Sequence, residues 1–384
     1  MPDSALLVPE YRTADPPDAM MSETDSVTTE MRSLRAGVVA VLAVLAFTPR
    51  PAAQGLPYAL FERYLESLRE QTAIPGISAV IVQGRRVVWE AGLGKQDIEK
   101  SVPTRADTPY LIGDLTQMFG AVVLGQCIER VGLNINEPVR RWTSEIPESS
   151  ATVRHVIAHA SGGAPGEAFL YDPARFATLT RVADDCAGRS FRRTVAEDIF
   201  DRLGMRDSLP GRDLERISAS SHDFFDDGKL KAYESVLLRL AVPYRVERNG
   251  KTTRGDYPAD AVTAAGGLIS TARDLARFDA AIDDDVLVAG ALRAAAWTNI
   301  TTSSGAPLPS GLGWFVQTYN GERLVWHFGS VGDTSSSLVL KVPARDITLI
   351  LLANSDGLSA PYGLPNGDVT ASLFAKLFLR LFLS

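Results

Sequence analysis

The sequence has no excess of positive charge, few cysteines and no long hydrophobic run. Its 39 lysines and arginines are outnumbered by 46 acidic residues, which gives a net charge of -7. A basic surface for nucleic acid is therefore not expected. The apolar share of 45% and the charged share of 22% are ordinary for a globular protein. The 384 residues leave room for one large domain or two moderate ones.

Only two cysteines are present, Cys127 and Cys186. Two cysteines are too few for a disulfide framework or a zinc site. Both fall in segments whose spacing predicts helices, and nothing in that spacing indicates that they lie close together. We favour two buried free thiols, and a disulfide is the alternative if the protein is exported.

The longest apolar run is the twelve-residue segment from Ala36 to Phe47, which follows Arg32 and Arg35. A relaxed membrane span needs about 20 apolar residues. A short run behind basic residues is typical of a signal peptide. We predict a signal peptide over 31–53, from Met31 to about Ala53, and a periplasmic or secreted protein. An uncleaved N-terminal membrane anchor is the alternative.

Residues 1–30 carry seven acids and one arginine, and they precede this basic segment. That arrangement is unusual for a signal sequence, and a translation start at Met31 explains it. We therefore expect 1–30 to lie outside the fold and to be unstructured.

Periodic apolar residues predict a helix over 56–71 and a hairpin of strands over 77–82 and 86–91. The middle of the chain is mainly helical, with segments expected at 118–131, 136–141, 152–160, 175–188, 191–203 and 270–281. Short strand-like runs follow at 314–319, 322–327, 335–342 and 348–354. The terminal segment 369–383 is amphipathic, and packing on a sheet is favoured over a membrane surface.

Strands at both ends and helices between them indicate a mixed α/β (α+β) fold. We expect one domain over 55–384, in which both chain ends build an antiparallel sheet flanked by helices. The sheet lobe is assigned to about 55–105 and 255–384, and an inserted, mainly helical lobe to about 106–254.

Four stretches carry a family resemblance: Thr108 to Phe119, Val153 to Gly163, Ala264 to Phe278, and Gly311 to Trp314 together with His327 to Gly332. In this order and spacing they resemble the serine β-lactamase-related family, of class C β-lactamase and D-Ala-D-Ala carboxypeptidase type, which are penicillin-binding-protein-like serine hydrolases. The resemblance covers about 57–383 and implies the β-lactamase/transpeptidase-like fold.

The resemblance also implies a chemistry. In the family, a serine at a helix N-terminus attacks a carbonyl while backbone N–H groups stabilise the oxyanion. A lysine one turn later and the tyrosine of a Tyr-x-Asn motif share the proton transfer. A His/Lys-x-Gly strand presents a donor and an edge for substrate.

Asp114 and Gln117 stand at the positions of the family's Ser-x-x-Lys. We interpret Asp114 as a helix cap or a ligand contact rather than a nucleophile, because a negative charge is favourable at a helix N-terminus. The Gln117 amide neither accepts a proton at neutral pH nor carries charge. We expect it to hydrogen-bond Asp114 or Tyr171.

The Tyr-x-Asn motif falls at Tyr171, with Pro173 in place of the asparagine. Without a cationic neighbour, we expect Tyr171 to keep an ordinary pKa of about 10 and to be a weak base. It remains useful as a hydrogen-bonding wall of a pocket.

His327 and Gly329 keep the third motif, and His327 is as suited to a structural role as to a functional one. Ser330 is disfavoured as a substitute nucleophile because no base is placed to activate it. His155 and His159 match family positions that we take as structural.

No Ser-x-x-Lys occurs elsewhere, and no Gly-x-Ser-x-Gly, HExxH, CxxC or phosphate-loop motif is present. No cofactor or metal is therefore expected. We predict an exported family member that is catalytically impaired and keeps its pocket for a small-molecule or peptidoglycan-like ligand, or for a scaffold role. The alternative is an active hydrolase (a β-lactamase, an esterase or a D-amino-acid peptidase) with rearranged catalytic residues.

Overall fold

The computed structural model describes residues 55–213, 225–258 and 261–383. The chain divides into the units Met1–Gly55 and Leu56–Ser384, and the fold is that of the second unit. The expected signal peptide over 31–53 and the unstructured 1–30 lie outside the described residues.

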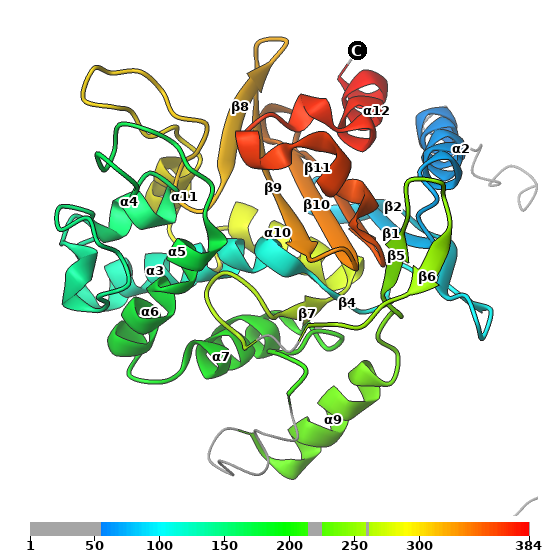
Figure 1. The fold of residues 1–384 in the computed structure, drawn as a ribbon, viewed down its shortest axis with the longest axis horizontal. Helices are drawn as coiled ribbons and strands as arrows, with labels where there is room; N and C mark the ends of the chain where they lie inside the picture. Colours follow the sequence, from blue (N-terminus) through cyan, green and yellow to red (C-terminus); the bar gives the residue numbers. More distant parts are fainter. Residues whose placement is uncertain (1–54, 214–224, 259–260, 384) are drawn as a thin grey trace, which may run out of the picture. The chain divides into compact units, whose positions relative to one another are not determined.

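The centre of the fold is a seven-stranded antiparallel sheet in the order β3-β2-β1-β11-β10-β9-β8 (Figure 1). Its strands are β1 (Gly76–Gln83), β2 (Arg86–Asp97), β3 (Val102–Pro103), β8 (Phe315–Tyr319), β9 (Glu322–Val331), β10 (Ser335–Val342) and β11 (Ile347–Ala353). Strand β1 pairs with β11 over the register from Ile77 opposite Ala353 to Gln83 opposite Ile347. The prediction that both chain ends build one sheet is therefore confirmed.

Helices α2 (Gly55–Gln71) and α12 (Leu373–Phe382) cover one face of this sheet (Figure 1). Their aromatic side chains Phe61 and Phe378 share a buried apolar cluster with alternate residues of β1 and β11. Side chains alternate between the two faces of a strand. The intervening residues of β1 and β11 therefore belong to a second buried cluster on the other face of the sheet. The C-terminal helix thus packs on the sheet, as its apolar stripe predicted.

On the other face α10 (Ala272–Asp283) packs against the sheet, and α3 (Thr116–Val131) and α6 (Leu179–Ala187) belong to the same buried cluster. Phe119 of α3 stacks on Phe278 of α10, with ring centroids 4.0 Å apart. Thr271 caps α10 by accepting a hydrogen bond from the Asp274 N–H.

The remaining elements are short. They are β4 (Tyr110–Leu111), η1 (Gly113–Leu115), η2 (Val139–Arg141), α4 (Val153–Ile157), α5 (Pro173–Ala177), α7 (Phe191–Thr194), the π-helix η3 (Val195–Asp201), α9 (Asp227–Leu237), β5 (Tyr244–Val246), β6 (Thr252–Arg254), β7 (Ile269–Ser270), α11 (Gly290–Ala296), and the 3-10 turns η4 (Pro343–Arg345), η5 (Asp356–Leu358), η6 (Ala360–Tyr362), η7 (Leu364–Asn366) and η8 (Val369–Ala371). Neither the hairpin of β5 and β6 nor the helices α9 and α11 were predicted. The expected helix over 191–203 is divided between α7 and η3.

Cys127 and Cys186 form a disulfide, so the preference for two free thiols is wrong. Cys127 lies near the end of α3 and Cys186 near the end of α6, two helices that pack against each other. This packing places their Cα atoms 5.9 Å apart, well within reach of a disulfide. A pattern of local spacing does not reveal such a contact, because the two residues are 59 positions apart.

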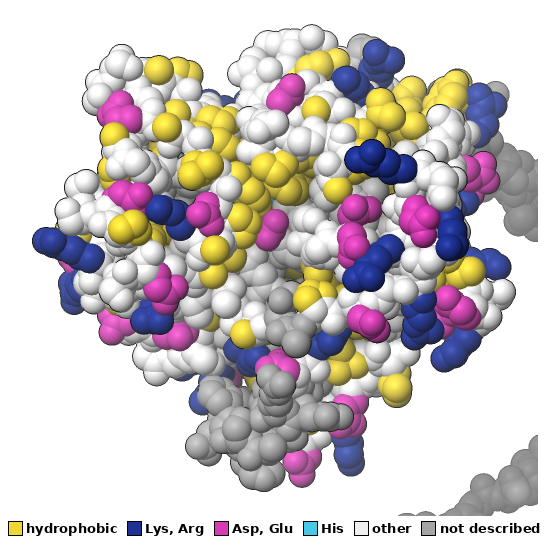
Figure 2. Space-filling view, viewed as in Figure 1, with side chains coloured by type: hydrophobic (Ala, Val, Ile, Leu, Met, Phe, Trp, Pro, Cys, Tyr) yellow, Lys and Arg dark blue, Asp and Glu magenta, His cyan; other side chains and the backbone are white. Residues whose placement is uncertain are grey.

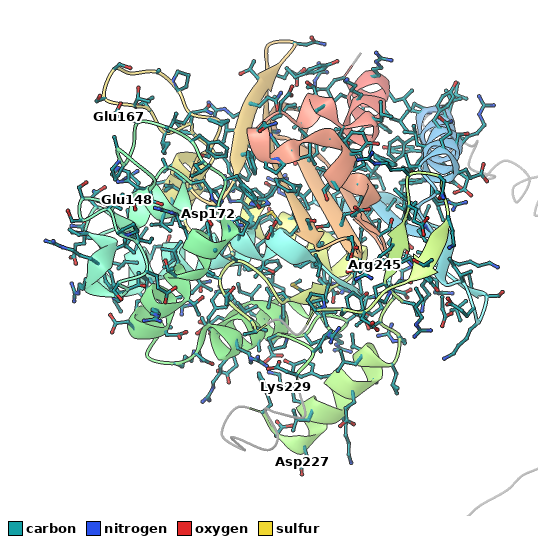
Figure 3. All side chains as sticks on the ribbon, viewed as in Figure 1. Glu148, Glu167, Asp172, Asp227, Lys229 and Arg245 are labelled. Atoms are coloured by element: carbon teal, nitrogen blue, oxygen red, sulfur yellow. A yellow bond between two sulfur atoms is a disulfide. The ribbon has the colours of Figure 1, made fainter. Side chains whose placement is uncertain are left out.

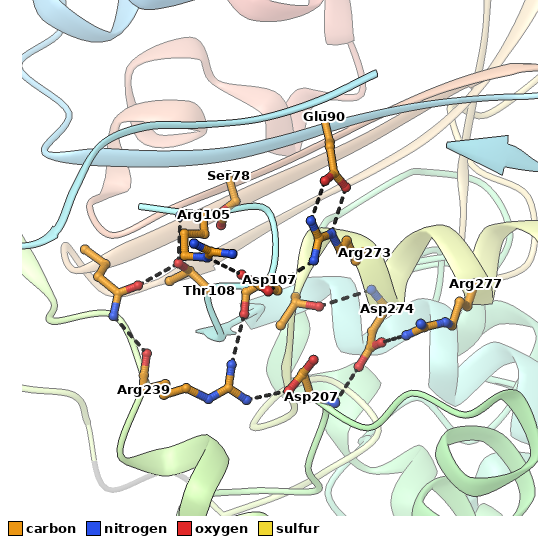
Figure 4. Close-up of polar contacts among 12 residues, drawn as sticks. Ser78, Glu90, Arg105, Asp107, Thr108, Asp207, Arg239, Arg273, Asp274 and Arg277 are labelled. Carbon is orange, nitrogen blue, oxygen red and sulfur yellow. Dashed lines mark hydrogen bonds and ion pairs between the residues drawn. The ribbon is translucent and has the colours of Figure 1, made fainter. Parts of the chain in front are cut away.

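A network of ion pairs fixes α10 to the sheet and to the segment before β4 (Figure 4). Arg273 binds Glu90 of β2 through Nε at 2.8 Å and Asp107 through Nη1 at 3.1 Å. The buried carboxylate of Asp274 accepts from the Ser208 hydroxyl at 2.9 Å and also pairs with Arg277. These contacts involve none of the residues at the family's catalytic positions, so the network is a framework for the fold.

No helix among the described residues has the length and apolar content that crossing a membrane requires.

Candidate functional site

Asp114 and Gln117 lie where the fold turns from β4 into α3. Asp114 is in the single 3-10 turn η1, and Gln117 is in the first turn of α3. Gly113 precedes them with φ of +57°, in the left-handed region that favours glycine. A Cβ on Gly113 would lie 2.7 Å from the backbone nitrogen of Ser330 on β9. The turn that carries Asp114 therefore lies in close contact with β9, the strand that carries the third motif.

Gly329 makes the same close approach from the other side. A Cβ at this position would lie 2.1 Å from the carbonyl oxygen of Ile112 and 3.2 Å from the backbone nitrogen of Asp114. Only glycine lets β9 come this near the turn. The structure thus brings together the first and third motifs.

Gln117 is fully buried and connects three other motif residues. Its Nε2 donates to the Tyr171 hydroxyl at 3.2 Å. Its Oε1 lies 2.8 Å from Nε2 of His159 and 3.3 Å from Nε2 of His327. The expected hydrogen bond to Tyr171 is present, and Gln117 is the centre of the network.

The two histidines are held in different tautomers. His159 accepts the Asp172 N–H at Nδ1 over 3.1 Å, so its Nε2 carries the hydrogen and donates to Gln117. His327 instead donates from Nδ1 to the carbonyl oxygen of Phe328 at 2.6 Å. Burial lowers the pKa of His159 to about 3 and that of His327 to about 4, so both rings are neutral at pH 7. The Nε2 of His327 is the ring atom that faces the Gln117 Oε1.

Asp114 is partly buried, and its carboxylate accepts a hydrogen bond from the Tyr171 hydroxyl. Asp114 is the acidic residue in the first turn of η1, and its side chain makes no capping hydrogen bond at η1 or α3. Burial raises the pKa of Asp114 to about 7, against the opposing effect of the hydrogen bond from Tyr171.

Tyr171 lies over a cluster of aromatic rings. Its ring centroid is 4.5 Å from that of His159, 5.0 Å from that of Phe328 and 5.7 Å from that of Phe315. Burial, and then the charge of Asp114, raise the pKa of Tyr171 well above 10. The expectation of an ordinary pKa is wrong, because burial disfavours the charged phenolate and the nearby Asp114 carboxylate disfavours it further.

Pro173 is the first residue of α5, where a missing N–H is tolerated. The preceding Asp172 caps this helix by accepting the Arg175 N–H at 3.0 Å. Arg175 is also paired with Glu148 at 2.7 Å, and Figure 3 places Glu148 and Asp172 on the same side of the molecule. Pro173 therefore shapes the loop after Tyr171, and its ring supplies no polar group to the network.

His159 and Ser330 lie outside the predicted set of site residues. His159 was taken as structural, yet it contacts Gln117 inside the network, and its place in the second motif was the only signal for it. Ser330 donates from Oγ to the carbonyl oxygen of Gly332 at 3.2 Å, in keeping with its disfavoured role as a nucleophile.

The surface around the site is largely apolar. Figure 2 shows hydrophobic side chains gathered over the middle of this face, between the helices of the helical lobe and strand β8. Phe169 is half-buried, and its ring centroid lies 5.7 Å from that of Phe315.

Comparisons with known proteins agree with these motifs. The model of the Beta-lactamase family matches residues 61–367. Penicillin-binding protein 4* of Bacillus subtilis is 21% identical over 76% of this chain and 70% of its own length. The mitochondrial serine beta-lactamase-like protein LACTB of Mus musculus is 30% identical, over 29% of this chain and 22% of its own length.

Solved structures give the same fold. The octameric penicillin-binding protein homologue from Pyrococcus abyssi matches with a TM-score of 0.68 and 22% identity, over 84% of this chain and 77% of that one. The D-amino acid amidase from Ochrobactrum anthropi SV3, solved with L-phenylalanine amide, matches with a TM-score of 0.65 and 18% identity, over 84% of this chain and 98% of that one.

Proposed function

The chain belongs to the β-lactamase family, and from that premise we propose that it is a catalytically impaired member whose site binds a ligand without forming an acyl-enzyme. The ligand is a small molecule or a peptidoglycan-like fragment. The observation that carries the proposal is the pair Asp114 and Gln117 at the positions of the family's nucleophile and lysine.

Three features of the network support the loss of acyl transfer. The Gln117 amide is engaged by Tyr171 and His159 and has no basic lone pair. The raised pKa of Tyr171 makes it a poor base. Within the described part of the chain, the buried lysine Lys341 is bound to Asp279 and Asp283 and is not available to the site.

We also propose that the protein is exported, with 31–53 as its signal peptide. The disulfide between Cys127 and Cys186 supports this, because disulfides persist in oxidising compartments. Cell fractionation with an antibody to the native protein tests it. A cytoplasmic protein with both thiols reduced contradicts it.

A fluorescent penicillin tests the impairment directly. We expect no covalent label on the purified wild-type protein after denaturing electrophoresis, because removing a serine nucleophile lowers turnover by about a millionfold in a related chemistry. Stoichiometric labelling of the wild type overturns the proposal.

A double variant supplies the matched control. Asp114→Ser together with Gln117→Lys restores the family's Ser-x-x-Lys at the turn into α3, and we expect it to be acylated. The single variant Gln117→Lys retains the carboxylate and should stay unlabelled. A double variant that folds but stays unlabelled locates a further defect at Pro173 or in the pocket.

One observation favours the second candidate, an active hydrolase with rearranged residues. A carboxyl group with a pKa of about 7 can both give and take a proton at neutral pH, and Asp114 has this property. A panel of activated esters, assayed with Asp114→Ala, Tyr171→Ala and His327→Ala, tests this candidate. Hydrolysis that all three variants leave unchanged does not come from this site.

A further inference from the structure

Farther along α3, the structure contains a cavity with an almost entirely apolar lining. Its volume is about 40 Å³, and together with the open solvent at its mouth the hollow measures about 520 Å³. It lies between α3, α10, α11 and the segment that leads into β8. Its floor includes the buried side chains Ile157, Ile282, Trp297 and Trp314. No residue at the family's catalytic positions lines it, so the cavity is separate from the site around Gln117.

Small residues keep the mouth of this cavity open. Ala121 and Gly125 lie on one face of α3, because residues four apart lie on the same side of a helix. Ala296 of α11 lines the cavity with them, and all three are partly exposed. The rest of the rim consists of three larger apolar residues that are also partly exposed: Ile128, Leu292 and Leu312. The apolar floor is therefore reached from solvent between side chains that do not close over it.

The lining and the volume together limit what can occupy the cavity. A buried water typically makes about three hydrogen bonds, and apolar walls do not supply them, so cavities of this composition stay dry. A single water needs roughly 10–15 Å³. On that scale the cavity accommodates an alkyl segment of about three to five carbon atoms, and each methylene buried there raises affinity about fourfold.

A cation at the mouth indicates how such a ligand ends. Arg293 of α11 is the only charged residue of the lining, and its side chain is 24% exposed. Its hydrogen bonds to the carbonyl oxygens of Ile282 and Asp283 both leave from Nη1. Its Nε and Nη2 therefore donate to no group of the described residues, and both are suited to bind an acceptor on a ligand.

The charge of Arg293 is already balanced by the protein. The Oδ1 of Asp285 lies 2.6 Å from the same Nη1. A neutral acceptor oxygen gains a hydrogen bond from the guanidinium at little cost in hydration. A carboxylate or an ammonium group gives up far more hydration and meets no net opposite charge from this pair.

We infer that this cavity is a second binding site, which takes a small aliphatic molecule of about three to five carbons that ends in a neutral acceptor oxygen. The alkyl chain lies on the apolar floor, and the oxygen accepts from Arg293 at the mouth. The inference involves neither Asp114 nor Gln117, so it does not depend on the proposed function.

Titration with 1-pentanol, followed by carbon-13 and proton NMR of the methyl groups, tests the inference. We expect the methyl signals of Ile128, Ile282 and Leu312 to shift and to saturate at millimolar concentration. Pentanoate and pentylamine have the same chain with a charged end, and they should bind at least about fivefold more weakly.

A pair of leucine variants on α11 supplies the matched control. Ala296→Leu fills the cavity and should abolish the shifts. Ala294→Leu adds the same side chain at an exposed position outside the lining and should bind as wild type. If Ala296→Leu unfolds, a series of alcohols on the wild type keeps the test decisive. Affinity should rise about fourfold per methylene from 1-propanol to 1-pentanol and level off by 1-heptanol, whose further methylenes stay in solvent.

Four results would overturn the inference. They are unchanged binding by folded Ale-free controls of the cavity, namely Ala296→Leu binding as wild type; tighter binding of pentanoate or pentylamine than of 1-pentanol; absence of methyl shifts at millimolar 1-pentanol; and an affinity that keeps rising to 1-heptanol. Shifts of the same methyl signals on raising the protein concentration alone would assign the cavity to a second copy of the chain and would also overturn it.

Discussion

The central sheet and the turn before α3 hold buried ionisable groups in opposite ways. Lys341 on β10 has a side chain that is 3% exposed and is paired with Asp279 at 3.1 Å and Asp283 at 2.7 Å, both on α10. Asp114 lies in the turn, and its carboxylate accepts from the neutral hydroxyl of Tyr171. The first group is fully compensated by charges within the protein, and the second meets only a neutral donor among the described residues.

The difference separates a charge that is paired within the fold from one that the fold leaves without a charged partner among the described residues. A paired buried charge holds elements together, and breaking the pair leaves partners without compensation. An unpaired carboxyl makes folding less favourable whenever it is ionised, and a perturbed carboxyl of this kind is a candidate functional group. Burial moves the pKa of Asp114 up for this reason, whereas the two aspartates hold the pKa of Lys341 above its ordinary value despite burial.

The largest effect is expected at the paired group. Lys341→Met leaves Asp279 and Asp283 buried without a cation, and we expect the free energy of unfolding to fall by about 3 to 5 kcal/mol. Urea denaturation measures it. Lys231→Met, at an exposed position of α9, removes the same charge and should change stability by less than about 0.5 kcal/mol. Equal losses of stability in the two variants would contradict the expected difference between a buried, paired lysine and an exposed one.

An opposite and smaller effect is expected at the unpaired group. The folded pKa of Asp114, about 7, lies above its ordinary value of 3.8, so ionisation lowers stability progressively as the pH rises from about 4 to 7. Asp114→Asn keeps the acceptor for Tyr171 and removes the ionisation. We expect it to stabilise the protein by about 2 kcal/mol above pH 8, roughly half the full value of the shift because the side chain is partly exposed.

The pH dependence is the discriminating part of that prediction. Thermal unfolding of wild type and Asp114→Asn should coincide near pH 4 and diverge as the pH rises. A variant that is less stable than wild type at pH 8 contradicts the expectation, since it means that the carboxylate is compensated in the fold.

The smallest effect is expected at an exposed pair. Arg245 and Asp333 are 2.7 Å apart, and each side chain is 55% exposed. Solvent screens such a pair, so Arg245→Gln should alter the free energy of unfolding by less than about 1 kcal/mol. Chemical denaturation at low and high salt measures it. A loss of stability comparable to that of Lys341→Met would show that exposure does not determine how much an ion pair contributes to the free energy of unfolding in this protein.

Periodicity predicted the elements whose apolar faces are regular. The helix at 56–71, the hairpin from Gly76 and the four C-terminal strands lie close to their expected places, because alternation and helical spacing both follow from burial against one sheet. The hairpin of β5 and β6 and the helix α9 were missed because they carry few buried apolar residues. Their positions depend on tertiary contacts.

The site was predictable in its membership more than in its interactions. Motif register identified Asp114, Gln117, Tyr171, Pro173, His327 and Gly329, and the structure brings all but Pro173 into one network or close backbone approach. The central position of His159, the partner of Asp114 and the disulfide all depend on side chains that meet across long sequence separations. Local sequence patterns contain no signal for such long-range side-chain contacts.

The titration of Asp114 itself shows whether this carboxyl lacks a compensating cation in the protein. Carbon-13 NMR of the side-chain carboxyl, assigned by comparison with Asp114→Asn, gives its pKa in the folded protein. We expect a value near 7 in the free protein. A value at or below 4 in the free protein would contradict this expectation, because a compensating charge or full solvation would then already be present.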